Sequence, residues 1–214
     1  MLDEHKKMVE YLRAIFECRD VTEEKHCRSV RRLVEILAER VMYFCPEYNL
    51  TEEKCEMIAC AGALHDVGKV AMSDRILQKP GRLSYDEFEI MKNHTRKGRK
   101  IFENIMKTVE KGSEEYAFLE CCAKVCMYHH ERYDGDGYPE GLKREEIPIE
   151  AQIVSLADTY DLLVSERVYK TAVTKEEAFD MIMEGECGIF SPRLLEIFQM
   201  VRMELEEVLE EMAG

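Results

Sequence analysis

The sequence lacks any apolar run near the roughly 18–20 residues of a membrane-spanning helix, and its first residues lack the apolar segment of a signal peptide. It also has no excess of basic residues, because 30 Lys and Arg against 44 Asp and Glu give a formal net charge of −14. A protein that coats nucleic acid needs basic surface to release counterions. No two of the nine cysteines have the Cys-x-x-Cys spacing, and an odd number disfavours a disulfide framework. We therefore expect a cytoplasmic protein with reduced, buried thiols that binds neither membranes nor nucleic-acid polymers.

Alternating strand patterns, internal repeats, low-complexity segments and Gly/Ser-rich linkers are also missing, whereas helical periodicity runs along the chain. One apolar stripe follows helical spacing closely: Val30, Leu33, Val34, Leu37, Ala38 and Val41. Pro46 should end that helix, Thr51 should begin the next, and Ser84 to Glu87 reads as a capping box. Further helices are expected near 113–130, 149–165, 174–185 and 191–213. The pattern predicts an all-α protein with one globular unit over 21–214 and a helical extension over 1–20.

Five of the six histidines fall on these apolar stripes or at helix ends: His26, His65, His94, His129 and His130. Asp66 and Asp158 are expected to point inward as well. A lone inward histidine is more often a hydrogen-bonded core residue than a ligand. A buried carboxylate without a partner, however, costs several kcal/mol. One shared metal site satisfies all seven side chains, because imidazole and carboxylate are common ligands of first-row divalent ions.

The adjacent pair His65-Asp66 indicates more than one ion. Neighbouring residues on a helix project about 100° apart, so this pair can offer a terminal ligand and a bridging carboxylate. Two divalent ions about 3.5–4 Å apart polarise a phosphoryl oxygen and acidify a water molecule, which suits phosphodiester hydrolysis.

Two segments carry a family resemblance. His65-Asp66-Val67-Gly68-Lys69 resembles the signature of the HD phosphohydrolase superfamily, and the stretch from His129 to Gly137-Tyr138-Pro139 resembles its HD-GYP branch. The likeness extends from about His26 to Pro192. HD-GYP proteins are bacterial all-α phosphodiesterases that linearise cyclic di-GMP, and some act on related cyclic dinucleotides. The resemblance implies an HD-domain-like bundle of about seven to nine helices around a metal site, with cyclic di-GMP as the first expected substrate.

The resemblance also implies roles for individual residues. One metal would be held by His26, His65, Asp66 and Asp158, and a second by the bridging Asp66 with His94, His129 and His130. Iron or manganese is the usual metal of the family. Asp66 and Lys69 would be catalytic, and the substrate would contact Lys69, Tyr138, Pro139, Asp161, Arg167 and Lys170.

Several departures and alternatives accompany this assignment. Thr22 stands where some family members carry a glutamate for a third metal, which favours two ions here. No sensor module fits in the residues before His26, so regulation is expected to come from a protein partner or from expression. A homodimer through the terminal helices stays open. Lys69 could instead complement a helix dipole, Arg167 and Lys170 could be surface charges, and the Gly-Tyr-Pro loop could be a structural turn. Glu131 is expected to orient a histidine.

The sequence also contains a basic segment and is compatible with two other functions. Residues 92–111 hold seven Lys or Arg against two Glu, which fits either a ligand funnel or a solvated helix face. The first functional alternative is a hydrolase of the same superfamily acting on another nucleotide or phosphate ester. The second is a catalytically weak module that binds a cyclic dinucleotide.

Overall fold

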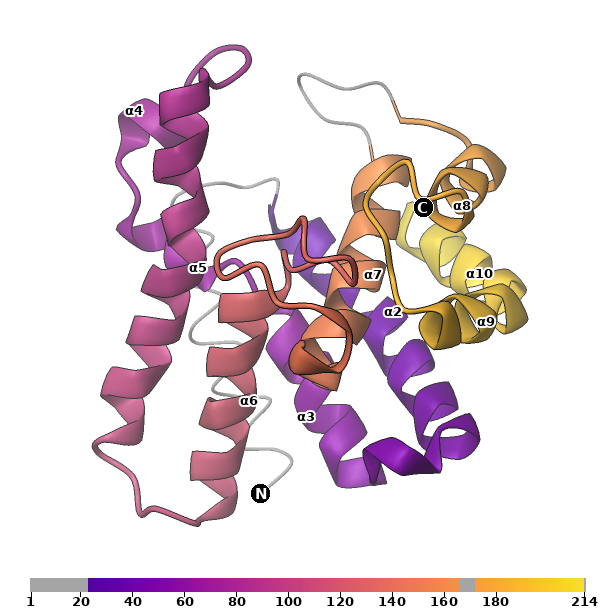
Figure 1. The fold of residues 1–214 in the computed structure, drawn as a ribbon, viewed down its shortest axis with the longest axis horizontal. Helices are drawn as coiled ribbons and strands as arrows, with labels where there is room; N and C mark the ends of the chain where they lie inside the picture. The colour runs from indigo at the N-terminus through magenta and orange to yellow at the C-terminus, as the bar shows by residue number, and fades with distance from the viewer. Residues whose placement is uncertain (1–22, 166–171, 214) are drawn as a thin grey trace.

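The computed structural model describes residues 23–165 and 172–213, and within these ranges the fold is all-α, as predicted (Figure 1). The expected extension over 1–20, Thr22, Arg167 and Lys170 lie outside the described residues. The described part contains nine α-helices and three short 3₁₀ helices, in the order α2 (Glu23–Phe44), η1 (Pro46–Tyr48), α3 (Glu52–Gly62), η2 (Val67–Ala71), α4 (Asp74–Leu77), α5 (Tyr85–Met106), α6 (Glu114–Tyr128), η3 (Arg144–Glu146), α7 (Ile149–Val164), α8 (Lys175–Met183), α9 (Pro192–Met200) and α10 (Arg202–Ala213).

Helix α2 lies at the centre of the bundle. It packs against α3 and α7, and also against α9 and α10 (Figure 1). The predicted stripe from Val30 to Val41 is fully buried, which confirms the periodicity argument. Each buried valine or leucine of this kind stabilises the fold by about 1.5–3 kcal/mol relative to an exposed one. The inner face of α2 therefore fixes the position of His26, one turn before Val30.

Helices α5 and α6 run side by side on the opposite flank of the molecule (Figure 1). The short helix η2, which follows His65 and Asp66, packs directly on α5. A Cβ atom on Gly68 would lie only 1.9 Å from the backbone oxygen of His94 and 2.5 Å from the backbone nitrogen of Gly98. Only glycine allows this approach, so Gly68 sets how closely Asp66 and His94 can meet.

Helix starts follow the predicted capping chemistry. The Ser84 side chain accepts a hydrogen bond from the backbone of Glu87, and the Glu87 side chain accepts one from Ser84, which confirms the capping box. Thr51 caps α3 through the backbone of Lys54, and Pro46 begins η1 directly after α2 has ended.

The expected single helix over 191–213 is wrong. The chain forms α9 and α10, which meet at a turn at Val201. Val201 is itself buried, and the change of direction lets apolar residues of both helices, such as Ile197 and Leu205, reach the same core.

The buried thiols agree with the expectation of reduced, buried cysteines. Cys45, Cys55, Cys122 and Cys126 are buried free thiols. Over the ranges that the structure describes, none of the helices combines the length and apolar character required to cross a bilayer.

Candidate metal centre

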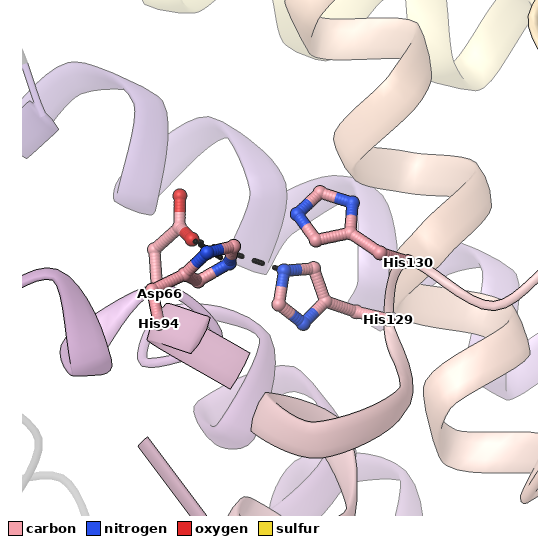
Figure 2. Close-up of side chains that lie close together, drawn as sticks. All are labelled: Asp66, His94, His129 and His130. Atoms are coloured by element: carbon pink, nitrogen blue, oxygen red, sulfur yellow. Dashed lines mark ion pairs between the residues drawn. The ribbon is translucent and has the colours of Figure 1, made fainter. Parts of the chain in front are cut away.

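The seven predicted ligands come from five separate segments and converge on one place. His26 comes from α2, His65 and Asp66 from the turn after α3, His94 from α5, His129 and His130 from the end of α6, and Asp158 from α7. Two groups have donor atoms within 4.8 Å of one another: Asp66, His94, His129 and His130 (Figure 2), and His26, His65 and Asp66. Asp158 joins the second group, since its Oδ1 lies 3.2 Å from His26 Nε2 and 3.5 Å from His65 Nε2. Asp66 belongs to both groups.

Most donor atoms of this cluster have no hydrogen-bond partner. Eight buried side-chain nitrogen or oxygen atoms in the described part of the chain are unsatisfied, and six of them belong to the predicted ligands: the Nε2 atoms of His26, His65, His94 and His129, and one oxygen each of Asp66 and Asp158. Buried polar atoms are rarely left unsatisfied in native proteins. Imidazole nitrogens and carboxylate oxygens that crowd together without bonding one another have the donor set of a divalent-metal site.

Backbone carbonyls fix which nitrogen of each imidazole is available. Nδ1 of His65 donates to the carbonyl of Gly62 at 2.7 Å, and Nδ1 of His94 donates to that of Met91 at 2.7 Å. Nδ1 of His129 donates to the carbonyl of Val125 at 2.9 Å. Because a carbonyl only accepts, the proton sits on Nδ1 and the lone pair of Nε2 faces the cluster.

Asp161, which is expected to contact the substrate, lies directly behind His26. Only 1% of it is exposed, and its carboxylate accepts from Nδ1 of His26 at 2.6 Å and from the hydroxyl of Ser29. A carboxylate behind a ligating imidazole sets the ring orientation and raises its basicity. Asp161 is thus placed to position His26, and its expected contact with the substrate stays a prediction.

Asp161→Asn should weaken metal binding at His26 without removing a predicted ligand. The amide lacks the negative charge that holds the imidazole, so the affinity for Mn²⁺ should fall about 10–100-fold. Titration calorimetry of the purified protein measures this change. Ser165→Ala is the control, because the Ser165 hydroxyl reaches the same carboxylate only at 3.4 Å and its loss should leave the affinity nearly unchanged. An unaltered affinity in Asp161→Asn would contradict the positioning role.

The charges of the cluster divide its histidines into two kinds. Burial lowers the pKa of His26, but Asp158 and Asp161 outweigh this effect and raise it to about 9. Burial and the neighbouring His65 lower the pKa of His129 to about 3. Burial opposes ionisation of Asp66, yet the charges of Lys69 and His65 hold its pKa well below the ordinary value. At neutral pH the cluster thus holds anionic carboxylates, a neutral His129 and a protonated His26.

These shifts predict the pH dependence of the metal-free protein. The raised pKa of His26 stabilises the fold fully below about pH 6.5, and this contribution is lost as the pH rises towards 9. The lowered pKa of His129 stabilises the fold above about pH 6.5, and this contribution is lost as the pH falls towards 3. With EDTA present, Tm should be highest near pH 6.5. Ligation needs an unprotonated His26, so the rise in Tm caused by Mn²⁺ should grow from pH 6.5 to 8.5. A rise that shrinks over this range would contradict the assignment.

Lys69 and Tyr138 lie on the accessible side of the cluster. The Lys69 side chain is 23% exposed, and its Nζ lies 2.5 Å from Asp66 Oδ2. The ring of Tyr138 stacks on that of His130, with centroids 4.6 Å apart and planes at 28°. The guanidinium of Arg96 donates to the carbonyl of Pro139 at 3.0 Å, which attaches the loop to α5. Lys69 and Tyr138, which are both expected to contact the substrate, therefore border the predicted ligands.

The loop that carries Tyr138 is held by Glu131, whose expected role was to orient a histidine. Its carboxylate instead accepts backbone N–H groups of Glu140, Gly141 and Leu142 at 2.7, 3.2 and 3.0 Å. Glu131 is 2% exposed, so this loop folds around a buried carboxylate. A Cβ atom on Gly137 would lie 2.3 Å from the backbone nitrogen of Arg132, so the first position of Gly-Tyr-Pro needs glycine. The predicted role of Glu131 is corrected to that of a loop anchor.

The basic segment 92–111 serves mainly local contacts. Lys92 pairs with Glu89, Arg99 pairs with Glu103, and Lys97 donates to the carbonyl of Ala71. These three of the seven cations thus have local partners, and Lys92 and Arg96 both reach the Gly-Tyr-Pro loop.

The sequence matches the HD domain family over residues 17–190. A cyclic di-GMP phosphodiesterase of Thermotoga maritima is 38% identical over 202 residues, which cover 94% of this chain and 50% of that protein. The cyclic di-GMP phosphodiesterase response regulator RpfG of Xanthomonas campestris pv. campestris is 40% identical over 162 residues, 76% of this chain and 40% of that protein. The chain thus spans about half the length, or less, of these curated relatives.

Solved structures share the fold. Bd1817, an HDGYP protein from Bdellovibrio bacteriovorus, aligns with a TM-score of 0.60 at 18% identity over 98% of this chain and 62% of that one. A cyclic GMP-AMP phosphodiesterase of Vibrio cholerae, V-cGAP3, aligns with a TM-score of 0.56 at 21% identity over 96% of this chain and 51% of that one. At these identities the similarity establishes the architecture.

Proposed function

Because this chain belongs to the HD-domain family, in its HD-GYP branch, we propose that it is a metal-dependent phosphodiesterase that hydrolyses a cyclic dinucleotide, with cyclic di-GMP as the first substrate to test. The observation that carries the proposal is the pair of donor groups that share Asp66, in which six buried donor atoms have no hydrogen-bond partner. Relatives that are cyclic di-GMP phosphodiesterases support the choice of substrate.

The donor set fits two divalent ions. His26, His65, Asp66 and Asp158 would hold one ion, and Asp66, His94, His129 and His130 would hold the other. Such ions, when bound, polarise a phosphoryl oxygen and lower the pKa of water. Iron or manganese is the proposed metal, since nitrogen and oxygen donors suit both.

The other residues of the site prepare it for an anionic diester. The Nδ1 bonds hold three imidazoles in the tautomer that presents Nε2, and Asp161 aims His26. Lys69 brings a fixed positive charge to the exposed side of Asp66, where a phosphate would be attracted in a protein of net charge −14. Tyr138 and Pro139 border the same side. Arg167 and Lys170, which lie beyond the described ranges, remain proposed phosphate or guanine contacts.

The setting of the enzyme is also part of the proposal. Residues 21–214 would act as one globular unit in the cytoplasm, with residues 1–20 as an extension. The proposal also includes assembly as a homodimer and, separately, regulation by a partner protein.

Turnover of cyclic di-GMP by anaerobically purified protein with Fe²⁺ or Mn²⁺ tests the proposal. We expect a linear dinucleotide or GMP as product, and loss of activity with EDTA that either metal restores. Turnover of other phosphate esters but no cyclic dinucleotide would favour a different hydrolase of the superfamily. Tight binding of cyclic di-GMP without turnover would favour a binding module. Either result would contradict the phosphodiesterase.

A further inference from the structure

We propose that Phe88, Tyr138 and Lys92 form a binding surface for a guanine base, next to the metal-ligand cluster. The inference rests on the proposed function, because it states where one base of a cyclic dinucleotide lies while a phosphate occupies the cluster. Phe88 and Lys92 belong to α5, on the same helix as His94, whereas Tyr138 belongs to the Gly-Tyr-Pro loop.

Aromatic contacts lead outward from the ligand cluster. His130 is a member of the cluster, and its ring stacks on Tyr138 with a centroid distance of 4.6 Å. The ring of Tyr138 meets that of Phe88 edge to face, with centroids 6.1 Å apart and planes at 82°. Phe88 is 43% exposed, so the series of rings runs from the half-buried His130 to solvent.

This arrangement of rings is more favourable with a planar base bound than in the free protein. An aromatic ring that stays exposed beside a polar site leaves apolar area in water, and a base stacked on it removes that area. Stacking of a base on an aromatic side chain contributes about 1–3 kcal/mol. The ligand cluster would bind the phosphate through its ions and offers no surface for a base, so the base of the same ligand must be held beside it.

Lys92 supplies the polar part of the surface. Its Nζ lies 5.2 Å from the centroid of Phe88 and 5.4 Å from that of Tyr138, within the range of a cation–π contact to both rings. One of its three N–H donors goes to Glu89 at 2.6 Å. The remaining donors of Lys92 can bond to acceptors of a base. Guanine offers two acceptors, O6 and N7, on one edge, whereas adenine offers N7 beside an amino group. The lysine therefore favours guanine over adenine.

Contacts fix the distance between the loop and α5, so the surface is preformed. Arg96 donates to the carbonyl of Pro139 at 3.0 Å, one residue beyond Tyr138. Glu131 anchors the following backbone from inside the loop. Figure 1 shows that the loop after α6 passes beside α5. The two aromatic rings thus keep their spacing without the ligand.

The test compares Phe88→Ala and Lys92→Met with Phe44→Ala, an aromatic of similar exposure, 46%, at the end of α2. Steady-state kinetics use cyclic di-GMP and methyl p-nitrophenyl phosphate, a diester without a base. We expect Phe88→Ala to lower kcat/KM for cyclic di-GMP about tenfold or more, mainly through KM. The loss for the base-free diester should be at least about fivefold smaller. Phe44→Ala should leave kcat/KM within about twofold, and metal content should be equal in all three proteins.

Inhibition by GMP and AMP tests the choice of base. Lys92→Met keeps the aliphatic stem and removes the donors, so the preference for GMP over AMP should shrink at least about threefold. An unchanged preference would overturn the role of Lys92. Phe88→Leu accompanies Phe88→Ala, because it removes the ring and keeps apolar volume, and both must melt near the Tm of the unmodified protein.

The outcomes separate this inference from the proposed function. Turnover by the unmodified protein with equal kcat/KM in Phe88→Ala, Phe88→Leu and Phe44→Ala would overturn the base-binding surface alone. An equal loss for both diesters would also overturn it, since the residues would then act on the cluster and not on a base. Absence of turnover of cyclic di-GMP by the unmodified protein would overturn the proposed function and this inference with it.

Discussion

Asp66→Asn should lower kcat/KM for cyclic di-GMP by at least about 10³-fold and abolish tight binding of both metals. Asp66 is the one side chain common to both donor groups, and its Oδ1 lies 3.2 Å from Nε2 of His94. The amide removes the negative charge that the two ions would share. A thousandfold loss corresponds to about 4 kcal/mol of transition-state stabilisation, a reasonable share for metal-ion catalysis.

The control for Asp66→Asn is Asp180→Asn, an exposed aspartate of α8. It makes the same chemical change away from the site and should keep metal content and kcat/KM within about twofold. Metal analysis and circular dichroism accompany the kinetics, so that loss of the fold is distinguished from loss of the ions. Two tightly bound ions per chain in Asp66→Asn, with kcat/KM within tenfold of the unmodified protein, would refute the shared-ligand assignment.

Glu131→Ala should release the Gly-Tyr-Pro loop. Its carboxylate accepts three backbone N–H groups, from Glu140, Gly141 and Leu142, and the substitution leaves all three without this acceptor. An unsatisfied buried donor costs about 1–3 kcal/mol, and water that enters the opened loop recovers part of this. The free energy of unfolding should therefore fall by about 2–4 kcal/mol. Because Tyr138 loses its fixed position, kcat/KM should fall about tenfold or more.

Amide hydrogen exchange at Gly141 and Leu142 distinguishes this mechanism from general destabilisation, because these two amides should exchange much faster than the core of α2. Glu131→Gln keeps an oxygen acceptor, so its exchange rates at these two amides should lie between those of the unmodified protein and those of Glu131→Ala. Glu145→Ala is the control: this exposed carboxylate on the same loop accepts from the Tyr133 hydroxyl at 2.8 Å, and its loss should cost under about 1 kcal/mol. Unchanged exchange at the two amides in Glu131→Ala would contradict the anchor role.

The helices and the inward histidines could be predicted because both follow from local periodicity. His26 lies one turn before a stripe whose members are all buried, and His129 continues the buried face of α6. The number of inward histidines, together with the cost of burying Asp66 and Asp158, was enough to expect convergence. The all-α architecture needed no information beyond the 3.6-residue pattern and the helix caps.

The positioning residues escaped prediction because their partners are set by tertiary packing. Asp161 bonds to His26 across 135 residues, and periodicity along α7 shows only that it points inward. A signal did exist: His26 and Ser29 are three apart on α2, as Asp158 and Asp161 are on α7, so two facing helices carry matched polar pairs. Glu131 had no such signal, since its partners are backbone groups of an irregular loop. The turn at Val201 was equally hidden, because it interrupts a continuous apolar pattern without Gly or Pro.

The imidazoles of the cluster are oriented in two different ways. His65, His94 and His129 are each oriented by a carbonyl three or four residues earlier in the chain, so their aim is complete once the local turn has formed. His26 is aimed only after α2 has docked on α7, because Asp161 supplies its orientation. Any loosening between those two helices would release the ion beside His26 and spare the ion beside His94. The proposed ions would then be unequal in lifetime, and the one beside His26 would exchange with metal in solution first.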